Sequence, residues 1–244
     1  MEALIKSGLE QLGLAGSVPE DSPARLARYG QLLLEKNRVM NLTAITEPRD
    51  VATLHMLDCA ALLNCADFQD KTLIDVGTGA GFPGVPLAVL APTLQVTLLD
   101  SLNKRVEWLE KACKALDLAN ACAIHARAEE AGREPSLRER FDYAAARAVA
   151  DLGVLAELCL PFVKEGGYFL AMKGPDCRLE VEQARPIIEA LGGTVDEVRS
   201  CAIPHTQVTH RVVRIRKTAP TPPQYPRRWA KIQQESKRRA QSAD

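Results

Sequence analysis

A glycine-rich stretch at residues 72–86 constrains the fold of this chain more than any other part of it. It reads TLIDVGTGAGFPGVP: a short apolar run leads into Asp75, four glycines follow within eight residues, and the apolar pattern resumes after Pro86. Glycine tolerates positive φ and close approach of a ligand, and proline suits a first helical turn. The order predicts a strand, a tight turn and a helix whose opening N–H groups can bind an anionic group. The alternative is a glycine-rich turn that binds nothing.

The spacing of the glycines favours one class of ligand. Dinucleotide-binding turns follow G-x-G-x-x-G, whereas here glycines fall at 77, 79 and 81 and Phe82 stands where the third glycine should be. The carboxylate of Asp75 would also repel a phosphate. S-adenosylmethionine (AdoMet), which carries an ammonium, a small carboxylate and a ribose, suits this loop better. We therefore predict AdoMet binding here, with Asp75, Gly77 and Gly79 among the cofactor-binding residues.

Strand and helix patterns alternate from residue 72 onward. This alternation predicts an α/β fold: a Rossmann-like, doubly wound, mostly parallel sheet. The last strand should add antiparallel, because no helix fits in front of it. We expect strands at 72–76, 95–99, 121–125, 141–146, 167–172, 194–200 and 209–216, and helices at 85–91, 102–117, 151–164 and 177–191, with an irregular or helical link at 126–139.

Three units are expected along the chain. Residues 1–68 carry apolar residues at helical spacing and predict an N-terminal helical subdomain. Residues 69–217 would form the AdoMet-binding core. Residues 218–244 form a basic tail with four prolines near its start, which we expect to lie extended over the surface.

The charge is unevenly distributed, although the 31 Lys and Arg balance the 31 Asp and Glu. Residues 211–244 hold ten basic and two acidic residues, which leaves 21 basic and 29 acidic residues in the rest of the chain. An acidic body with a basic end segment indicates a polyanionic partner. The alternative is a solvated tail without a partner.

Composition and sequence patterns also indicate the cellular compartment of the protein. No apolar run approaches the about 18 residues of a membrane span, and the N-terminus lacks the pattern of a signal peptide. The seven cysteines form no C-x-x-C pair, which favours reduced thiols over a disulfide framework or a zinc site. We expect a cytoplasmic protein without a bound metal.

The carboxyl ends of the predicted strands carry the candidate site residues, because ligands of doubly wound sheets bind there. Asp100 follows the second strand, 23 residues after Gly77, where an acid can grip both ribose hydroxyls. It could instead cap the next helix. After the third strand, Ala128 and Glu129 could supply an apolar wall and polar groups for adenine. The alternative for Glu129 is a solvated acid in a first helical turn.

Two cations follow the next strands. Arg147 ends the fourth strand among small apolar residues, and Lys173 ends the fifth. Arg147 could contact a ligand carboxylate or a nucleic acid phosphate, or stack on a base, and its alternative is a structural ion pair. His55 and Asp58, three apart on a predicted helix, could form a structural hydrogen bond.

Nine motifs in order resemble those of the RsmG (GidB) family, the bacterial 16S rRNA guanine-N7 methyltransferases. They are NLTAIT (41–46), HMLD (55–58), DVGTGAGFPGVPLA (75–88), TLLDSLNKRVEWL (97–109), RAEE (127–130), ARAVA (146–150), ELCLPFVKEGG (157–167), MKG (172–174) and YPRR (225–228). The resemblance covers nearly the whole chain. It departs at Cys59, where the family usually has Ser, and after YPRRWAKI in the tail.

The resemblance implies transfer of a methyl group from AdoMet to N7 of guanosine 527, in the 530 loop of 16S rRNA within the small ribosomal subunit. It implies that the AdoMet contacts come from Gly77, Phe82, Ala128, Glu129 and Arg147, with Asp100 at the ribose. Residues 69–217 would then be the methyltransferase core.

Guanine N7 has a free lone pair and no proton, so the predicted reaction needs no general base. We expect Arg147 and Lys173 to act as catalytic residues by positioning the target, in a monomer without an obligate protein partner. The alternatives are an AdoMet enzyme with another substrate, a non-catalytic ribosome-assembly binder, and an NAD-dependent oxidoreductase, which the glycine spacing disfavours.

Overall fold

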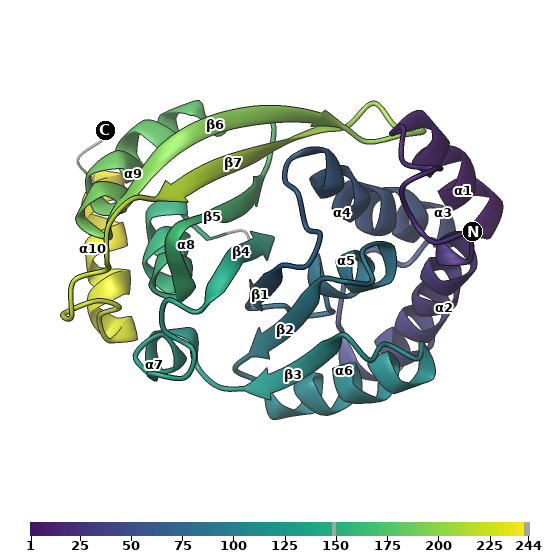
Figure 1. Ribbon diagram of the computed structural model, residues 1–244, viewed down its shortest axis with the longest axis horizontal. Coiled ribbons are helices and arrows are strands. Elements are labelled where there is room, and N and C mark those ends of the chain that lie inside the picture. Colours follow the sequence, from purple (N-terminus) through teal and green to yellow (C-terminus); the bar gives the residue numbers. More distant parts are fainter. Residues whose placement is uncertain (148–149, 242–244) are drawn as a thin grey trace.

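The computed structural model describes residues 1–147 and 150–241 and contains a seven-stranded sheet in the order β3-β2-β1-β4-β5-β7-β6 (Figure 1). The first five strands run parallel, and β7 pairs antiparallel with both β5 and β6. The predicted doubly wound sheet with an antiparallel last strand is therefore confirmed. The strands are β1 (Thr72–Val76), β2 (Gln95–Asp100), β3 (Ala121–His125), β4 (Phe141–Arg147), β5 (Val163–Lys173), β6 (Gly193–Ala202) and β7 (Thr209–Lys217).

Helices cover both faces of the sheet. On one face, the hydrophobic cluster joins the N-terminal helices, α5 and α6 to Leu73 and Leu98 of the sheet. On the other face, α8 and α9 pack against Ile74, Val76 and neighbouring strands. The helices after β1 are α5 (Gly84–Leu90), α6 (Asn103–Ala115), α7 (Ala128–Ala131), α8 (Leu152–Cys159), the 3₁₀ turn η3 (Leu160–Phe162), α9 (Arg178–Ala190) and α10 (Trp229–Gln241).

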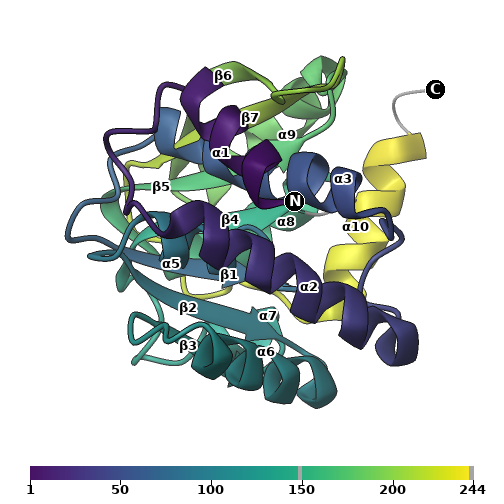
Figure 2. The same ribbon diagram turned by 90° about the vertical axis from the view of Figure 1, so that its right-hand side faces the viewer.

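The first 64 residues are mostly helical, and Figure 2 shows α1, α2 and α3 together on one side of the molecule. They comprise α1 (Glu2–Gln11), α2 (Ser22–Met40), α3 (Pro48–Asp50), the π-helical η1 (Val51–Leu57), α4 (Asp58–Ala60) and the 3₁₀ turn η2 (Ala61–Asn64). Their buried side chains share one hydrophobic cluster with the sheet. The division at residue 68 remains a prediction.

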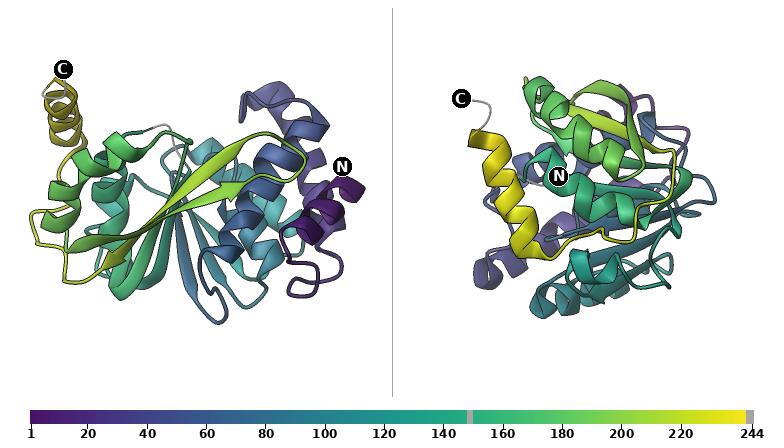
Figure 3. Two further views of the ribbon diagram at one scale, coloured as in Figure 1. Left: turned by 90° about the horizontal axis from the view of Figure 1, so that it is seen from above. Right: turned by 90° about the vertical axis from the view of Figure 1, so that its left-hand side faces the viewer.

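The C-terminal tail differs from the expectation. Residues 218–228 are largely irregular, but residues 229–241 form α10, so the prediction of a fully extended tail was wrong for that segment. Helix formation becomes possible once the prolines end, and Ile232, which is 1% exposed, secures α10 to the body. The helix packs against α8, at the opposite end of the molecule from the N-terminus (Figure 3).

The fifth strand also begins earlier than predicted, at Val163 instead of residue 167. Pro161 lies in η3 and ends the helical stretch that we expected to reach residue 164. No helix in the described part of the chain is long and apolar enough to cross a membrane.

Candidate active site

The glycine loop after β1 presents bare backbone at the carboxyl edge of the sheet. Gly77 and Thr78 donate their N–H groups to the Leu99 carbonyl at 2.9 and 3.0 Å, which ties the loop to β2. Gly77 has φ +69°, and a Cβ on it would project into open space with no atom within 4 Å. The loop therefore leaves room for a ligand to lie directly against the main chain.

Asp75 supports this loop from inside the protein. Its side chain is fully buried, and its Oδ2 accepts hydrogen bonds from Thr78 Oγ1 at 2.7 Å and from the Gly84 N–H at 2.8 Å. Oδ1 has no hydrogen-bond partner among the described residues. Burial raises the pKa of Asp75 to about 6. The contacts show Asp75 bracing the turn, and its contact with a cofactor remains a prediction.

Asp100 lies at the end of β2 beside the same loop. Its Oδ2 accepts from the Gly79 N–H and its Oδ1 from the Leu102 N–H, both at 2.9 Å, and Arg105 lies 3.4 Å away. Each carboxylate oxygen has two lone pairs, so both retain capacity for a ligand hydroxyl. Asp100 thus orders the glycine loop and the turn before α6 while still facing a cavity.

That cavity, which we call the nucleoside cavity, has a volume of about 240 Å³. It combines the Asp100 carboxylate with Gly77 and an apolar wall. Glu129 is 8% exposed and forms an ion pair with Arg127 at 2.6 Å, so it is not the solvated acid of the alternative interpretation. The cavity is also lined by Leu99, Ala128, Leu155, Leu158 and Trp229.

A second cavity of about 510 Å³, the target cavity, also borders Gly77. Gly77 therefore belongs to both cavities, which meet at the glycine loop. The target cavity is lined by the predicted site residues Gly79, Phe82, Arg147 and Lys173, together with Leu42, Thr43, His55, Thr78, Ala80, Arg105, Met172, Gly174 and His210.

Arg147 is held from several sides. Its guanidinium donates to the Leu54 carbonyl at 3.1 Å and to His55 Nδ1 at 2.9 Å, and it lies 4.6 Å from the centre of the Phe82 ring. Asp58 Oδ2 is 3.5 Å away, which is an ion-pair distance. Arg147 thus has the structural ion pair of the alternative interpretation and also faces the target cavity, with its side chain 20% exposed.

His55 and Asp58 contact Arg147 rather than forming the predicted bond to each other. Because Arg147 can only donate, Nδ1 of His55 accepts, and Nε2 carries the proton that faces Thr43 Oγ1 at 2.9 Å. Burial, then the charge of Arg147, lowers the pKa of His55 to about 3, so this imidazole stays neutral. Asp58 Oδ1 pairs with His210 at 2.9 Å, and this bond raises the pKa of His210.

Lys173 borders the target cavity but is itself paired. Its Nζ donates to the Ala150 carbonyl at 2.8 Å and forms an ion pair with Glu180 at 2.6 Å, and its side chain is 8% exposed. Its role toward a target remains a prediction. Of the ARAVA motif, Ala148 and Val149 lie outside the described residues.

Comparison with known proteins identifies the family. Residues 23–209 match GidB, described as rRNA small subunit methyltransferase G. The chain belongs to this family. Two relatives of that name support the assignment: the protein of Alkaliphilus metalliredigens is 46% identical over 92% of this chain and 94% of its own length, and that of Alkaliphilus oremlandii is 42% identical over 96% and 98%.

A solved structure gives a likeness of fold alone. The branched-chain polyamine synthase of Thermus thermophilus is 14% identical, with a TM-score of 0.55 over 84% of this chain and 66% of that one. As a member of the GidB family, the chain is an AdoMet-dependent methyltransferase.

The residues present fit AdoMet. The nucleoside cavity offers a carboxylate for ribose hydroxyls and an apolar wall for adenine, and the open backbone at Gly77 admits a ligand between the two cavities. Among residues 1–147 and 150–241, no group of three or more His, Cys, Asp or Glu could hold a metal ion.

Among the lining residues that sequence reasoning did not identify are Thr43, His210 and Trp229. Thr43 lies within the NLTAIT motif, which was a usable signal. His210 and Trp229 carry no local signal, because strand pairing and the path of the tail bring them to the site.

Proposed function

We propose that the chain transfers the methyl group of AdoMet to N7 of guanosine 527, in the 530 loop of 16S rRNA within the small ribosomal subunit. The observation that carries the proposal, beside family membership, is the target cavity that meets the nucleoside cavity at Gly77. A guanine in the target cavity would lie next to the sulfonium end of a cofactor whose nucleoside fills the nucleoside cavity. We further propose that the chain acts as a monomer in the cytoplasm.

AdoMet supplies an activated methyl group, so the protein contributes mainly proximity and alignment. N7 carries no proton to remove, and the neutral His55 in this cavity is therefore not required as a base. We assign His55 a different task. It accepts from Arg147 at 2.9 Å and fixes the orientation of that guanidinium.

Arg147 would orient the target through its planar fork, by bonding a phosphate or guanine O6. Leu54, His55 and Asp58 engage part of its five donors, which leaves donors for a ligand. Guanine becomes cationic when N7 is methylated. Since Arg147 is paired with Asp58, and Lys173 with Glu180, the cavity repels that product less than two free cations would.

The basic C-terminal segment would contribute to RNA binding, but not with all of its charges. Arg214, Lys217 and Arg227 form ion pairs within the protein. We therefore propose that Arg228 and Lys231 contribute phosphate contacts, and that binding to small subunits weakens as salt concentration rises.

The test is incubation of the protein with radiolabelled AdoMet and small subunits that lack the modification, followed by mapping of the label. We expect one methyl group at N7 of guanosine 527, and no comparable transfer to free 16S rRNA. Label at another nucleotide would assign a different substrate. Binding without transfer would favour the non-catalytic binder.

A further inference from the structure

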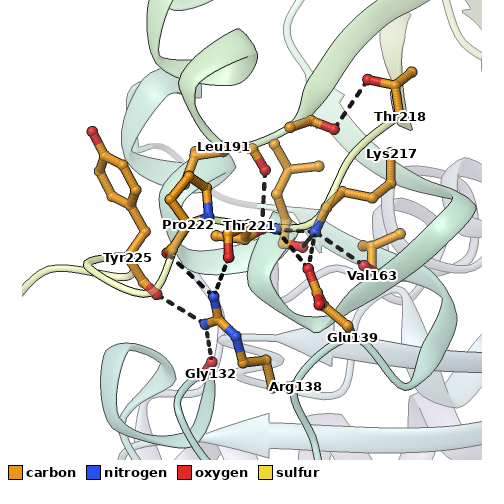
Figure 4. Close-up of polar contacts among 12 residues, drawn as sticks. Gly132, Arg138, Glu139, Val163, Leu191, Lys217, Thr218, Thr221, Pro222 and Tyr225 are labelled. Carbon is orange, nitrogen blue, oxygen red and sulfur yellow. Dashed lines mark hydrogen bonds and ion pairs between the residues drawn. The ribbon is translucent and has the colours of Figure 1, made fainter.

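Residues 217–228, which we call the strap, connect the end of β7 to α10 and are anchored by cationic side chains, of which Lys217 and Arg138 are drawn in Figure 4. Lys217 is fully buried, and its Nζ donates to Glu139 Oε1 at 2.9 Å and to Thr221 Oγ1 at 2.7 Å. Two carbonyl oxygens, of Leu160 and Val163, complete its shell. A buried ammonium is tolerated only with such partners, so the start of the strap is fixed in place.

Arg138 fixes the middle of the strap in the same manner (Figure 4). Its guanidinium donates to the carbonyls of Thr221 at 2.6 Å and Tyr225 at 2.9 Å, and also to that of Gly132 in the body. Arg133 donates to the Pro226 carbonyl from two nitrogens. These bonds hold an otherwise irregular segment against the region around α7.

Arg227 fixes the end of the strap to α8. Its Nε donates to Glu157 Oε1 at 2.8 Å and its Nη2 donates to Glu157 Oε2 at 2.6 Å. Its backbone N–H also donates to Glu157 Oε1 at 2.8 Å. Glu157 is 1% exposed. Arg227 also pairs with Glu235 of α10 at 2.6 Å. The first turn of α10 is thereby set relative to α8, two residues after Arg227.

The strap positions Trp229, which lines the nucleoside cavity together with Leu155 and Leu158 of α8. Ile232, one turn later, is 1% exposed and is the residue that packs α10 onto the body. Trp229 is only half-buried, although it is the larger side chain. Trp229 both lines the cavity and keeps exposed surface, as expected of a ligand-contacting aromatic residue rather than of a core residue.

We propose that Trp229 is a specificity-determining residue of the cofactor site. In this proposal its indole stacks on the adenine ring, and the strap holds it in that position. A flat indole beside two leucines forms the apolar slot that a purine prefers, while Asp100 is available for the ribose. This inference rests on the proposed function, since it requires that AdoMet occupies the nucleoside cavity.

The first experiment measures binding of AdoMet and S-adenosylhomocysteine by calorimetry. Trp229→Ala raises the Kd of both ligands about tenfold, the usual scale for loss of one base–aromatic stack. Trp229→Phe retains an aromatic face and recovers most of the affinity. Gln233→Ala, an exposed neutral position on the same helix, leaves the Kd unchanged. Unchanged Kd values in Trp229→Ala would overturn the proposal.

The second experiment uses fluorescence, which a merely structural role would not move. The chain has two tryptophans, so Trp108→Phe leaves Trp229 as the sole indole emitter. Saturating S-adenosylhomocysteine then changes the emission intensity of Trp229. Ligand binding without any change in emission would contradict the contact. If the wild-type protein bound neither ligand, the proposed function would fail as well, so the two failures are distinguishable.

Discussion

The nucleoside cavity and the target cavity share Gly77 but are built in different ways. Asp100, Ala128 and Glu129 follow the ends of successive strands, so the sheet itself brings them to the nucleoside cavity. The target cavity depends on side chains from distant elements that contact one another. Arg147 of β4 donates to His55 of η1, and Asp58 of α4 forms ion pairs with Arg147 and with His210 of β7. Backbone geometry therefore dominates one half of the site, and a charge network dominates the other.

This difference predicts that substitutions in the two cavities have separable effects. Substitutions in the nucleoside cavity should act mainly on affinity for AdoMet. Substitutions in the target cavity should act mainly on the methylation rate. A residue that impairs both equally would show that the two halves are coupled through the glycine loop.

The largest effect is expected for Asp100→Ala. Loss of charge-assisted bonds to two ribose hydroxyls should weaken AdoMet binding at least about a hundredfold. The Gly79 N–H also loses its acceptor, so circular dichroism and thermal unfolding should accompany the calorimetry. Asp100→Asn, which keeps an acceptor oxygen, should retain more affinity than the alanine variant. Near-normal affinity in both variants would remove Asp100 from the ribose.

Arg147→Ala should come next and should affect the other half of the site. We expect single-turnover methylation of small subunits to fall about thirtyfold, the scale of one lost charged hydrogen bond, while the fold is retained. AdoMet affinity should fall less than in Asp100→Ala. Arg147→Lys should rescue poorly, since an ammonium cannot reproduce the planar fork. An unchanged single-turnover rate would contradict the assignment.

Lys173→Ala should have a smaller effect, because Lys173 is already paired with Glu180. We expect single-turnover methylation to fall about fivefold. Lys164→Ala is a matched control, since Lys164 lies near the other end of β5, is paired with Asp142 at 2.6 Å and is far more exposed. Equal loss in the two variants would point to general stability of β5 instead of a role at the target.

The smallest effect concerns pH and His210. Its pKa is raised in the folded protein, chiefly by the bond to Asp58. The pair therefore stabilises the fold fully below the ordinary histidine pKa of about 6.5, and the stabilisation is lost as pH rises through the higher folded value. Thermal unfolding of wild type and His210→Gln across pH 5.5 to about 8.5 should show wild type losing stability relative to the variant. Parallel curves would exclude a proton-linked role.

The side of the nucleoside cavity that the strand ends form was predictable from the sequence because its parts are local, whereas Leu155, Leu158 and Trp229 on its other side were not. Asp100 ends a strand at a fixed distance from Gly77, and the glycine loop carries its own conformational signal. The parallel direction of the first strands followed from the alternation of strands and helices, and the antiparallel addition of β7 followed from the short connection before it. The order of the strands in the sheet was not predicted. The complete burial of Asp75 and its raised pKa could not be predicted from the sequence, because burial behind the loop depends on the tertiary structure.

The target cavity was predictable only in part. Arg147 and Lys173 were identified by their place at strand ends, but their partners were not. Asp58 meets His210 across 152 residues of sequence. Lys173 pairs with Glu180 in the first turn of α9, just after β5, and this contact depends on how the chain turns between the two elements. The helical end of the tail was missed because its anchors, Arg227 and Ile232, acquire their partners from α8 and the body.

The place of β7 between β5 and β6 governs how the molecule can be completed as it is synthesised. β6 leaves the ribosome before β7, yet it has no neighbour in the sheet until β7 follows and reverses direction. His210, Lys217 and Trp229 all lie on or after that strand, so the partner of Asp58, the strap and the wall beside Leu155 arrive last. A growing chain thus holds its glycine loop and Asp100 for most of its synthesis without a finished site around them. The cofactor pocket can therefore be completed only after the chain has been synthesised past Trp229.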